Sequence, residues 1–253
     1  MIAPGKYEHG EGFHNLDSPN EIVPYVIDLL KPKSVVDFGC GIGTFLAAFK
    51  NNGVDDILGL DGVWVDMQLL EKYIPRQHFQ TWDLEKAITL NRKYDLVISL
   101  EVAEHLSEEA ADTFVDSLSN AGDVILFSAA IPNQGGQNHI NEQWLDYWEE
   151  KFALRGLTLY DTLRPIFWDN PKIFWWYKQN MVIFSRHSLA KNNPSPYKNV
   201  VHPEFYDYHE KQWQSKWADV VDGKWSSFEY LKLLLKSLIG RDRFKKLKKM
   251  IGD

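Results

Sequence analysis

The sequence predicts an α/β protein in which helices flank a doubly wound, mainly parallel β-sheet. Three observations support this fold class. Short β-branched runs alternate with segments of helical periodicity between residues 20 and 186. A glycine-rich loop directly follows the first of these runs. The chain has 253 residues and is 44% hydrophobic, which is enough to bury a sizeable core.

The first half of the chain begins with a helix at residues 20–31, where apolar residues recur at helical spacing. Ser18-Pro19 is expected to form its cap and first turn, and Pro32 to follow its end. A second helix is expected at residues 44–51, closed by Gly53. Strands are expected at residues 34–38, 56–60, 79–82 and 94–100.

The second half continues the alternation with helices at residues 108–119 and 143–155. Strands are expected at residues 123–129, 157–163 and 180–185. Connections between parallel strands are right-handed, and ligands of such sheets bind at the carboxyl ends of the strands. The polar motifs discussed below fall at such ends.

The chain divides into a main domain at residues 1–187 and a helical extension at residues 188–253. Within the main domain, residues 1–19 are a candidate lid over the ligand. The segment Lys191-Asn192-Asn193-Pro194-Ser195-Pro196 is typical of a linker.

Composition narrows the class of protein. No apolar run reaches the length of a membrane span, and the first residues do not resemble a signal peptide. A single cysteine, Cys40, excludes an internal disulfide and a zinc site built on several thiolates. These features predict a cytoplasmic protein. The net charge of -7 argues against long nucleic acid as a partner.

The tail at residues 231–251 is apolar on one side and rich in Lys and Arg. Such a segment can be a solvated helix that packs on the domain or on a second subunit, so a homo-oligomer is one expectation. The other is a helix on a membrane surface, which would place the protein at the periphery of the inner membrane.

The loop Asp37-Phe38-Gly39-Cys40-Gly41-Ile42-Gly43 lies between a predicted strand and a predicted helix. Its glycines allow a tight turn and a close approach of backbone to a ligand. Dinucleotide sites use a similar loop. However, Asp37 precedes the first glycine by two residues, and a carboxylate there suits a cationic ligand better than a pyrophosphate.

The segment from Val36 to Gly43 resembles motif I of class I S-adenosylmethionine-dependent methyltransferases, and the resemblance continues over residues 20–186. It implies a Rossmann-like, seven-stranded mixed sheet and S-adenosylmethionine as cofactor. The resemblance implies cofactor contacts from Asp37, Gly39, Cys40, Gly41, Asp61, Gly62, Trp82, Asp83, Leu84 and Glu101.

Each acid has a role in this resemblance. Asp61 would accept hydrogen bonds from the two ribose hydroxyls, and Asp83 from the adenine amine. Glu101 would face the methionine end of the cofactor. Trp64 or Trp82 would stack on the adenine ring.

Glu101-Val102-Ala103-Glu104-His105 follows the fourth strand and is the candidate for the reacting end. In one mechanism, His105 or His139 is the general base, assisted by Glu104. In the other, Glu101, Glu104, His105 and His139 bind Mg²⁺ or Mn²⁺, which lowers the pKa of the acceptor hydroxyl. The Glu-x-x-Glu-His spacing is similar to that of ubiquinone-pathway and small-RNA 2′-O-methyltransferases, which bind such a metal.

The loop at residues 131–144 and the stretch at residues 175–180 resemble a bacterial methyltransferase subgroup associated with surface polysaccharides. Aromatic rings interleaved with amides suit sugars. Asn141 would also cap the next helix. Arg164 and Lys178 would hold a phosphate of a sugar carrier. The substrate-binding candidates are Asn141, Trp144, Arg164, Tyr177 and Gln179.

The sequence therefore predicts O-methylation of a sugar, sugar nucleotide or glycan substituent in surface-polysaccharide biosynthesis. N-methylation of an amino sugar, 2′-O-methylation of RNA and methylation of a phenol are alternatives. A non-enzymatic alternative is a cofactor-binding partner subunit, although the acids and His105 argue against it.

Overall fold

The structure of the protein is a computed structural model that describes residues 10, 12–189 and 198–239. The chain forms two compact units, the first ending at His202 and the second beginning at Pro203. The expected linker at residues 191–196 lies outside the described residues, as do residues 1–9 of the candidate lid and residues 240–253 of the tail.

The first unit extends beyond the expected boundary at residue 187 because the chain returns to it at residue 198. The Lys198 carbonyl accepts a hydrogen bond from the Arg164 guanidinium at 2.8 Å. The His202 N–H donates to the Gln179 side-chain oxygen at 2.9 Å. These bonds attach residues 198–202 to the first unit.

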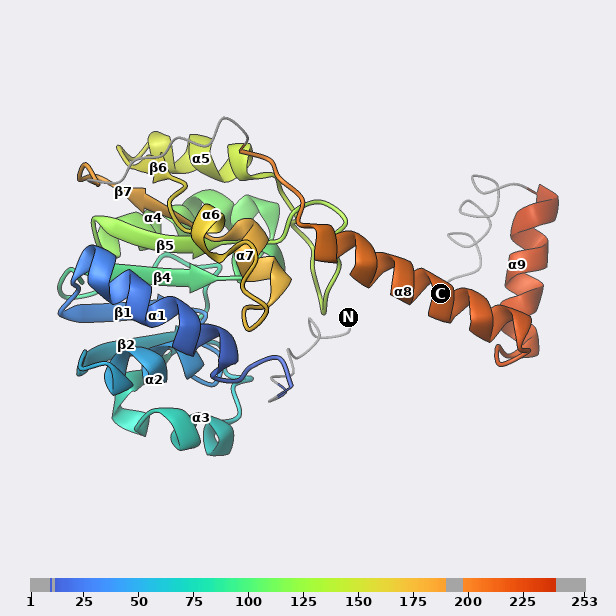
Figure 1. The fold of residues 1–253 in the computed structure, drawn as a ribbon, viewed down its shortest axis with the longest axis horizontal. Coiled ribbons are helices and arrows are strands. Elements are labelled where there is room, and N and C mark those ends of the chain that lie inside the picture. Colours follow the sequence, from blue (N-terminus) through green and yellow to red (C-terminus); the bar gives the residue numbers. More distant parts are fainter. Residues whose placement is uncertain (1–9, 11, 190–197, 240–253) are drawn as a thin grey trace. The chain divides into compact units, whose positions relative to one another are not determined.

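The core of the first unit is a seven-stranded sheet with the order β3-β2-β1-β4-β5-β7-β6 (Figure 1). β7 is antiparallel to both of its neighbours, and the other pairs are parallel. This confirms the predicted doubly wound, mixed sheet. The strands are β1 (Ser34–Phe38), β2 (Asp56–Asp61), β3 (Phe79–Thr81), β4 (Leu96–Leu100), β5 (Val124–Ser128), β6 (Thr158–Tyr160) and β7 (Val182–Ser185).

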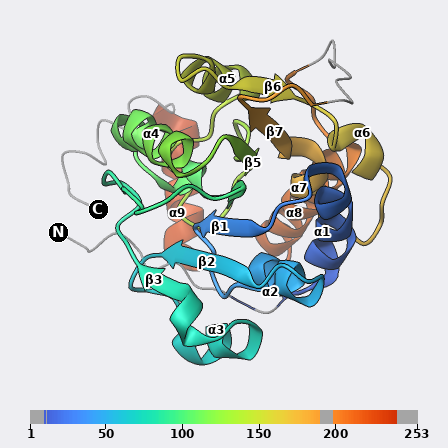
Figure 2. The same ribbon diagram turned by 90° about the vertical axis from the view of Figure 1, so that its left-hand side faces the viewer.

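Helices cover both faces of the sheet (Figure 2). One hydrophobic core contains side chains of α1, α2 and α6, and the other contains those of α4 and α5. Along β4, Leu96 and Ile98 belong to the first core and Val97 to the second, because successive strand residues point to opposite faces. The helices of this unit are α1 (Asp17–Leu30), α2 (Thr44–Asn51), α3 (Met67–Tyr73), α4 (Ala111–Ala121), α5 (Leu145–Ala153), α6 (Arg164–Phe167) and α7 (Trp175–Asn180).

The predicted cap of the first helix is wrong. α1 begins at Asp17, and its N-cap residue Leu16 makes no side-chain capping bond. Ser18 is buried, and its hydroxyl accepts a hydrogen bond from the Phe174 N–H at 3.0 Å. Its oxygen therefore joins α1 to the start of α7 instead of capping the helix.

Several element ends also differ from the prediction. The strand expected at residues 157–163 is shorter than predicted, because only Thr158–Tyr160 form it as β6. Helix α6 then begins at Arg164. The expected capping residue Asn141 lies outside α5, whose N-cap residue is Trp144. α3, α6 and α7 were not predicted, because helices this short show little periodicity.

The second unit contains α8 (Pro203–Val221) and α9 (Ser227–Ile239), as expected for a helical extension. None of the helices in the described part of the chain combines the length and hydropathy that crossing a membrane requires.

A pair of leucine variants tests the packing of α4 on the sheet. Leu118 is fully buried in the second core, whereas Leu154 is 78% exposed after α5. We expect Leu118→Ala to lower the free energy of unfolding by about 2–5 kcal/mol, because it removes buried methyl groups and leaves a cavity. Leu154→Ala should change it by less than about 0.5 kcal/mol. Urea unfolding followed by circular dichroism measures both, and equal effects would contradict this packing.

Candidate functional site

The carboxyl ends of the parallel strands β1, β2, β4 and β5 meet at one edge of the sheet. The strand order reverses between β1 and β4, and ligands of doubly wound sheets bind at such a point. The glycine loop after β1 is tied to the end of β2, because the N–H groups of Gly39 and Cys40 donate to the Leu60 carbonyl at 2.7 and 3.2 Å. The loop and the acid that ends β2 are thereby held together.

At two positions of this loop, the structure leaves no room for a side chain. Gly39 and Gly43 have φ values of 89° and 84°, in the left-handed region. A Cβ atom on Gly39 would lie 2.4 Å from Cγ2 of Val102, and one on Gly43 would lie 2.9 Å from Ile74. The loop can therefore pack this closely against its neighbours only with glycine at both positions.

Asp61 ends β2 as a buried carboxylate that receives backbone hydrogen bonds. The N–H of Gly41 donates to one oxygen at 2.7 Å, and the N–H of Gly62 donates to the other at 2.6 Å. The Trp64 side chain also hydrogen bonds to this carboxylate. Burial nevertheless raises the pKa of Asp61 to about 6. The Trp64 ring lies against Gly62, where a Cβ atom would be 2.3 Å from the indole.

Two further buried carboxyl groups lie on the neighbouring strand ends. Burial and the charge of Asp61 raise the pKa of Asp37 well above its usual range. Burial raises the pKa of Glu101 to about 7. Among the described residues, none of the groups that shift these three pKa values is a cation. A ligand that carries a sulfonium and an ammonium would supply the missing positive charge, so these residues fit S-adenosylmethionine.

The other predicted cofactor residues differ in where their side chains lie. The Cys40 thiol packs against Gly59, where a Cβ atom would be 2.6 Å from Sγ, and donates a hydrogen bond to the Gly41 carbonyl at 3.6 Å. Leu84 is buried in the second core. Asp83 is half-exposed and pairs with Lys86 at 2.9 Å.

Trp82 lies beside the outer strands of the sheet. Its N–H donates to the Gln80 side chain at 3.2 Å. It lines a surface hollow of about 410 Å³ together with Arg92 and Tyr94. This hollow is separate from the glycine loop, whose residues do not line it.

At the reacting end, Glu104 and His105 lie in a 3-10 turn after β4. Glu104 is fully buried, and no hydrogen bond of regular geometry reaches its carboxylate oxygens among the described residues. Its own backbone N–H, that of Ala130 and the Glu101 side chain nevertheless lie close enough to affect the pKa values of the two acids. Burial and the charge of Glu101 raise the pKa of Glu104 well above its usual range. Burial and the neighbouring His139 lower the pKa of His105 to about 4, so its imidazole is neutral near pH 7.

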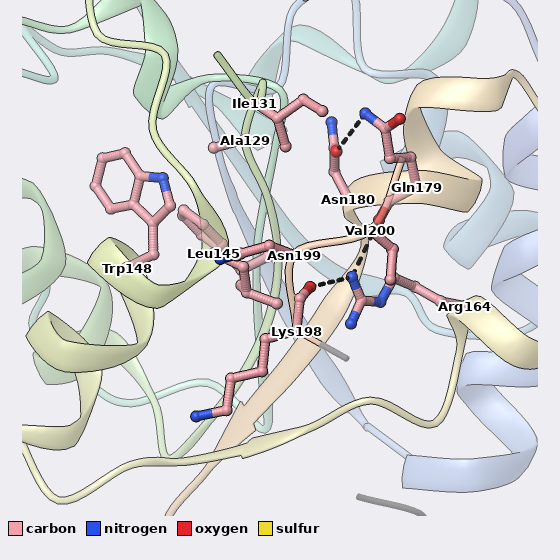
Figure 3. Close-up of a pocket in the computed structure, with 11 residues that line it drawn as sticks. Ala129, Ile131, Leu145, Trp148, Arg164, Gln179, Asn180, Lys198, Asn199 and Val200 are labelled. Carbon is pink, nitrogen blue, oxygen red and sulfur yellow. Dashed lines mark hydrogen bonds between the residues drawn. The ribbon is translucent and has the colours of Figure 1, made fainter. Parts of the chain in front are cut away.

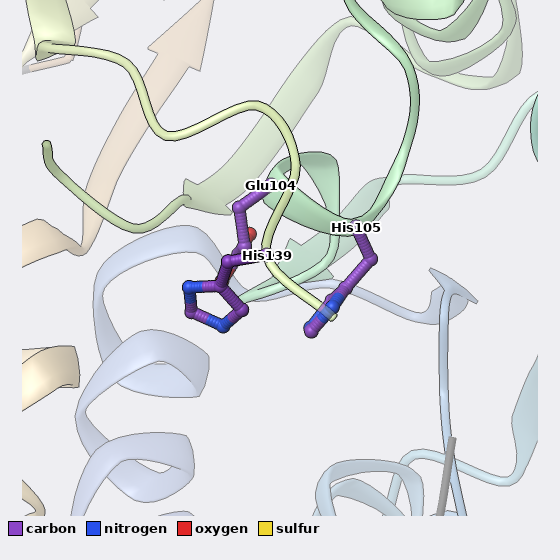
Figure 4. Close-up of side chains that lie close together, drawn as sticks. All are labelled: Glu104, His105 and His139. Atoms are coloured by element: carbon purple, nitrogen blue, oxygen red, sulfur yellow. The ribbon is translucent and has the colours of Figure 1, made fainter. Parts of the chain in front are cut away.

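His139 reaches the same place from the loop after β5. Its ring meets the His105 ring edge-on, with the ring centres 4.8 Å apart (Figure 4). Its Nδ1 lies 2.9 Å from a Glu142 oxygen. Gly136 lies directly against this ring, since a Cβ atom there would be 2.2 Å from Nε2 of His139.

Glu104, His105 and His139 each offer a ligand atom, and these atoms lie within 4.8 Å of one another. The cluster contains three of the four residues that the sequence suggested as metal ligands. The fourth, Glu101, instead accepts hydrogen bonds from the side chains of Gln134 at 2.8 Å and Asn180 at 3.1 Å.

The predicted phosphate-binding role of Arg164 is contradicted by the structure. Its guanidinium is buried and makes two hydrogen bonds to Asp161, at 2.8 and 2.7 Å. Arg164 and Gln179 line a narrow pocket of about 10 Å³ (Figure 3). This space holds about one water molecule, which is far too little for a sugar. Lys178 is also buried.

The remaining substrate candidates divide into two groups. Tyr177 packs edge-on against Phe45, with 5.4 Å between ring centres, and belongs to the margin of the first core. Asn141 is buried, with its side-chain oxygen bonded to Gln143 and its Nδ2 without a partner among the described residues. Trp144 is exposed at the start of α5, near the His139 loop.

The described part of the candidate lid packs against α7. The Phe13 ring lies 6.3 Å from that of Phe174 and 6.0 Å from that of Trp176. His14 is close enough to His105 for its charge to lower the pKa of His105. The segment before α1 therefore approaches the reacting end.

Sequence reasoning missed Gln134, Asn180 and Glu142 as site residues. Gln134 and Asn180 hold Glu101, and Glu142 holds the His139 loop, with its oxygens accepting from the N–H groups of Asn133 and Gly135. The three-residue spacing of His139 and Glu142 is a local pattern in the sequence from which Glu142 could have been identified. The pairing of Asn180 with Glu101 joins distant segments and carries no local signal.

Comparison with known families identifies the class of protein. A family model described as a methyltransferase domain matches residues 15–191, and this range is more than half of the chain. The chain therefore belongs to this family of methyltransferase domains. Its sheet order and glycine loop make it a class I S-adenosylmethionine-dependent methyltransferase. No curated protein matches the sequence significantly.

Solved structures share the fold. The methyltransferase domain of bacterial CtHen1-C is 18% identical, with 69% of this chain and 100% of that chain covered and a TM-score of 0.51. DesVI from Streptomyces venezuelae is 15% identical, with 72% and 100% covered and a TM-score of 0.53. CalS10, an amino pentose methyltransferase from Micromonospora echinaspora with S-adenosylmethionine bound, is 12% identical, with 68% and 91% covered and a TM-score of 0.53.

The raised pKa of Asp61 predicts a pH dependence of cofactor binding. Ribose hydroxyls bind best to an ionised carboxylate, and Asp61 becomes protonated as the pH falls through about 6. We expect the affinity for S-adenosylhomocysteine, measured by calorimetry, to fall about tenfold from pH 7.5 to pH 5. Asp61→Asn should bind weakly at both pH values with a smaller change between them. An affinity of the native protein that does not vary with pH would contradict this role.

Proposed function

We propose that this methyltransferase transfers a methyl group to a hydroxyl of a sugar, a sugar nucleotide or a glycan substituent in surface-polysaccharide biosynthesis. We further propose that Glu104, His105 and His139 hold a divalent cation, Mg²⁺ or Mn²⁺, that activates this hydroxyl.

The observation that carries the proposal is the cluster of one carboxylate and two imidazoles. Its ligand atoms lie within 4.8 Å of one another, and the Glu104 oxygens are buried without a hydrogen bond of regular geometry among the described residues. A buried carboxylate is costly unless it is paired or bound to a metal. Nitrogen and oxygen ligands of this kind suit a borderline or hard divalent ion.

The alternative role for these residues is general-base catalysis by His105 or His139. A base works best when its pKa lies near the working pH, and that of His105 is about 4. A neutral imidazole, in contrast, is the form that binds a metal. The arrangement therefore favours metal assistance over proton transfer to His105.

When bound, the cation would lower the pKa of the acceptor hydroxyl and so make its oxygen a better nucleophile. The chain's own residues orient the groups. Glu142 accepts the proton on Nδ1 of His139, which leaves the Nε2 lone pair directed away from Glu142. The carboxylates of Asp37, Asp61 and Glu101 bind the cofactor, so that its methyl group can align with the acceptor oxygen and the sulfur.

Two features support a sugar acceptor. Gln137, Asn138 and Trp144 are exposed along the same loop as His139, and amides with an aromatic ring suit hydroxyl-rich ligands. CalS10, which shares the fold, is an amino pentose methyltransferase. A net charge of -7 disfavours RNA as the acceptor.

The proposal is tested by incubating the protein with S-adenosylmethionine and a panel of sugar nucleotides, capsule precursors and lipopolysaccharide precursors. A product with one added methyl group on oxygen, located by tandem mass spectrometry, is the expected result. If the only product carries the methyl group on the nitrogen of an amino sugar, the assignment changes from O-methylation to N-methylation. Transfer to RNA or a phenol, with no sugar methylated, would contradict the sugar assignment.

Metal binding can be measured without turnover. We expect the protein to bind Mn²⁺ in electron paramagnetic resonance titrations, and Glu104→Gln to weaken binding by about 10–100-fold because it removes the anionic ligand. Glu109→Gln changes a nearby exposed glutamate and should leave Mn²⁺ affinity unchanged. Mn²⁺ binding that is absent, or that is equal in all three proteins, would rule out a metal at Glu104 and leave His105 or His139 as the candidate base.

Glu142 is expected to act as a positioning residue for His139. Glu142→Gln should lower kcat by about 10–100-fold with little change in the KM for S-adenosylmethionine, because it alters the histidine and not the cofactor site. Glu150→Gln, on the exposed side of α5, serves as the control. A rise in KM without a fall in kcat would assign Glu142 to cofactor binding instead.

A further inference from the structure

Helix α9 presents an exposed apolar stripe. Four large apolar residues spaced three or four positions apart lie on one side of the helix. Phe228, Leu231, Leu234 and Leu238 are exposed to 63%, 49%, 54% and 72%. In an isolated chain this many apolar side chains on one helix face indicate a surface that another molecule covers.

Cationic residues border this stripe. Lys232 borders the stripe at Phe228, where its ammonium lies over the Phe228 ring at 4.4 Å, and Lys236 lies one turn further along, on the polar side of the helix. Glu229 is the single acidic residue of α9. The helix therefore combines an apolar face with a positively charged margin.

Charge is strongly segregated along the sequence. Residues 231–253 contain eight Lys or Arg and two acidic residues, a net charge of +6. The whole chain has a net charge of -7, so residues 1–230 carry -13. A cationic segment attached to an acidic protein is attracted to an anionic surface that the rest of the chain would avoid.

Helix α8 lacks this combination. It also has exposed aromatic residues, Tyr206, Trp213 and Trp217. However, it contains four acidic residues and two lysines, so an anionic surface would repel it. The charge pattern therefore distinguishes α9 from its neighbour in the same unit.

We propose that α9 binds the surface of an anionic lipid bilayer. The stripe of Phe228, Leu231, Leu234 and Leu238 would enter the boundary between headgroups and acyl chains. Lys232 and Lys236 would remain among the headgroup phosphates. Apolar burial and electrostatic attraction act together in such helices, which lie in the plane of the membrane and do not cross it.

The test uses the full chain and vesicles in a flotation assay. The protein should float with vesicles of phosphatidylcholine containing 30% phosphatidylglycerol and remain unbound with pure phosphatidylcholine. Lys232→Glu combined with Lys236→Glu should lower partitioning about tenfold or more, since each cation near the surface contributes about fivefold. Salt at 0.5 M should reduce binding by the native protein.

A matched pair of leucine variants tests the stripe. Leu234 belongs to it, whereas Leu233 lies on the other side of α9 and is exposed to a similar degree, 46%. Leu234→Glu should reduce partitioning at least fivefold more than Leu233→Glu. Circular dichroism of both variants checks that the helices remain folded.

Three results would overturn the proposal. The first is absence of binding to anionic vesicles at low salt. The second is an equal loss of binding in the two leucine variants. The third is a native protein that light scattering shows to be a dimer, together with a monomeric Leu234→Glu variant and no vesicle binding by either protein. That result would assign the stripe to contact with a second copy of the chain.

Discussion

The structure depends most on the cost of burying several carboxylates at one edge of a parallel sheet. Asp37, Asp61 and Glu101 end neighbouring strands, and their pKa values are raised because burial disfavours their charged forms. The fold compensates with neutral hydrogen-bond donors and leaves positive charge to a ligand. The site therefore has the electrostatic character of a receptor for a cation, which S-adenosylmethionine satisfies.

The donors that hold these acids come from distant parts of the chain. The Gly41 N–H of the glycine loop donates to Asp61, whereas side-chain amides of Gln134 and Asn180 donate to Glu101. Gln179 extends this network by binding Asn180 and accepting a hydrogen bond from the N–H of His202. The short helix α7 and the returning segment at residues 198–202 thus fix the orientation of Glu101, whose own backbone has an unfavourable φ of 55°.

Parts of this arrangement could be predicted from the sequence because they follow from local rules. Strands buried on both faces appear as short apolar runs, and parallel pairing brings the residues after each run to the same edge. The convergence of Glu104, His105 and His139 follows from that geometry. The direction of side chains such as Arg164 and Gln179 could not be predicted, because it depends on contacts with Asp161 and the segment after residue 198. Their residue types suited sugars, but tertiary packing turned them inward.

Arg164 and Glu104 show how the same physical rule separates a structural charge from a functional one. Both are almost completely buried, and an isolated buried charge is unfavourable. The Asp161 carboxylate neutralises Arg164 through two hydrogen bonds, so this pair is complete within the protein. Among the described residues, the pKa of Glu104 is shifted by burial, by acids and by backbone N–H groups but by no cation, and no hydrogen bond of regular geometry reaches its oxygens. Two imidazoles lie within ligand distance of it. A proton or a cation can neutralise this carboxylate, and the cation is what the proposed metal site would supply.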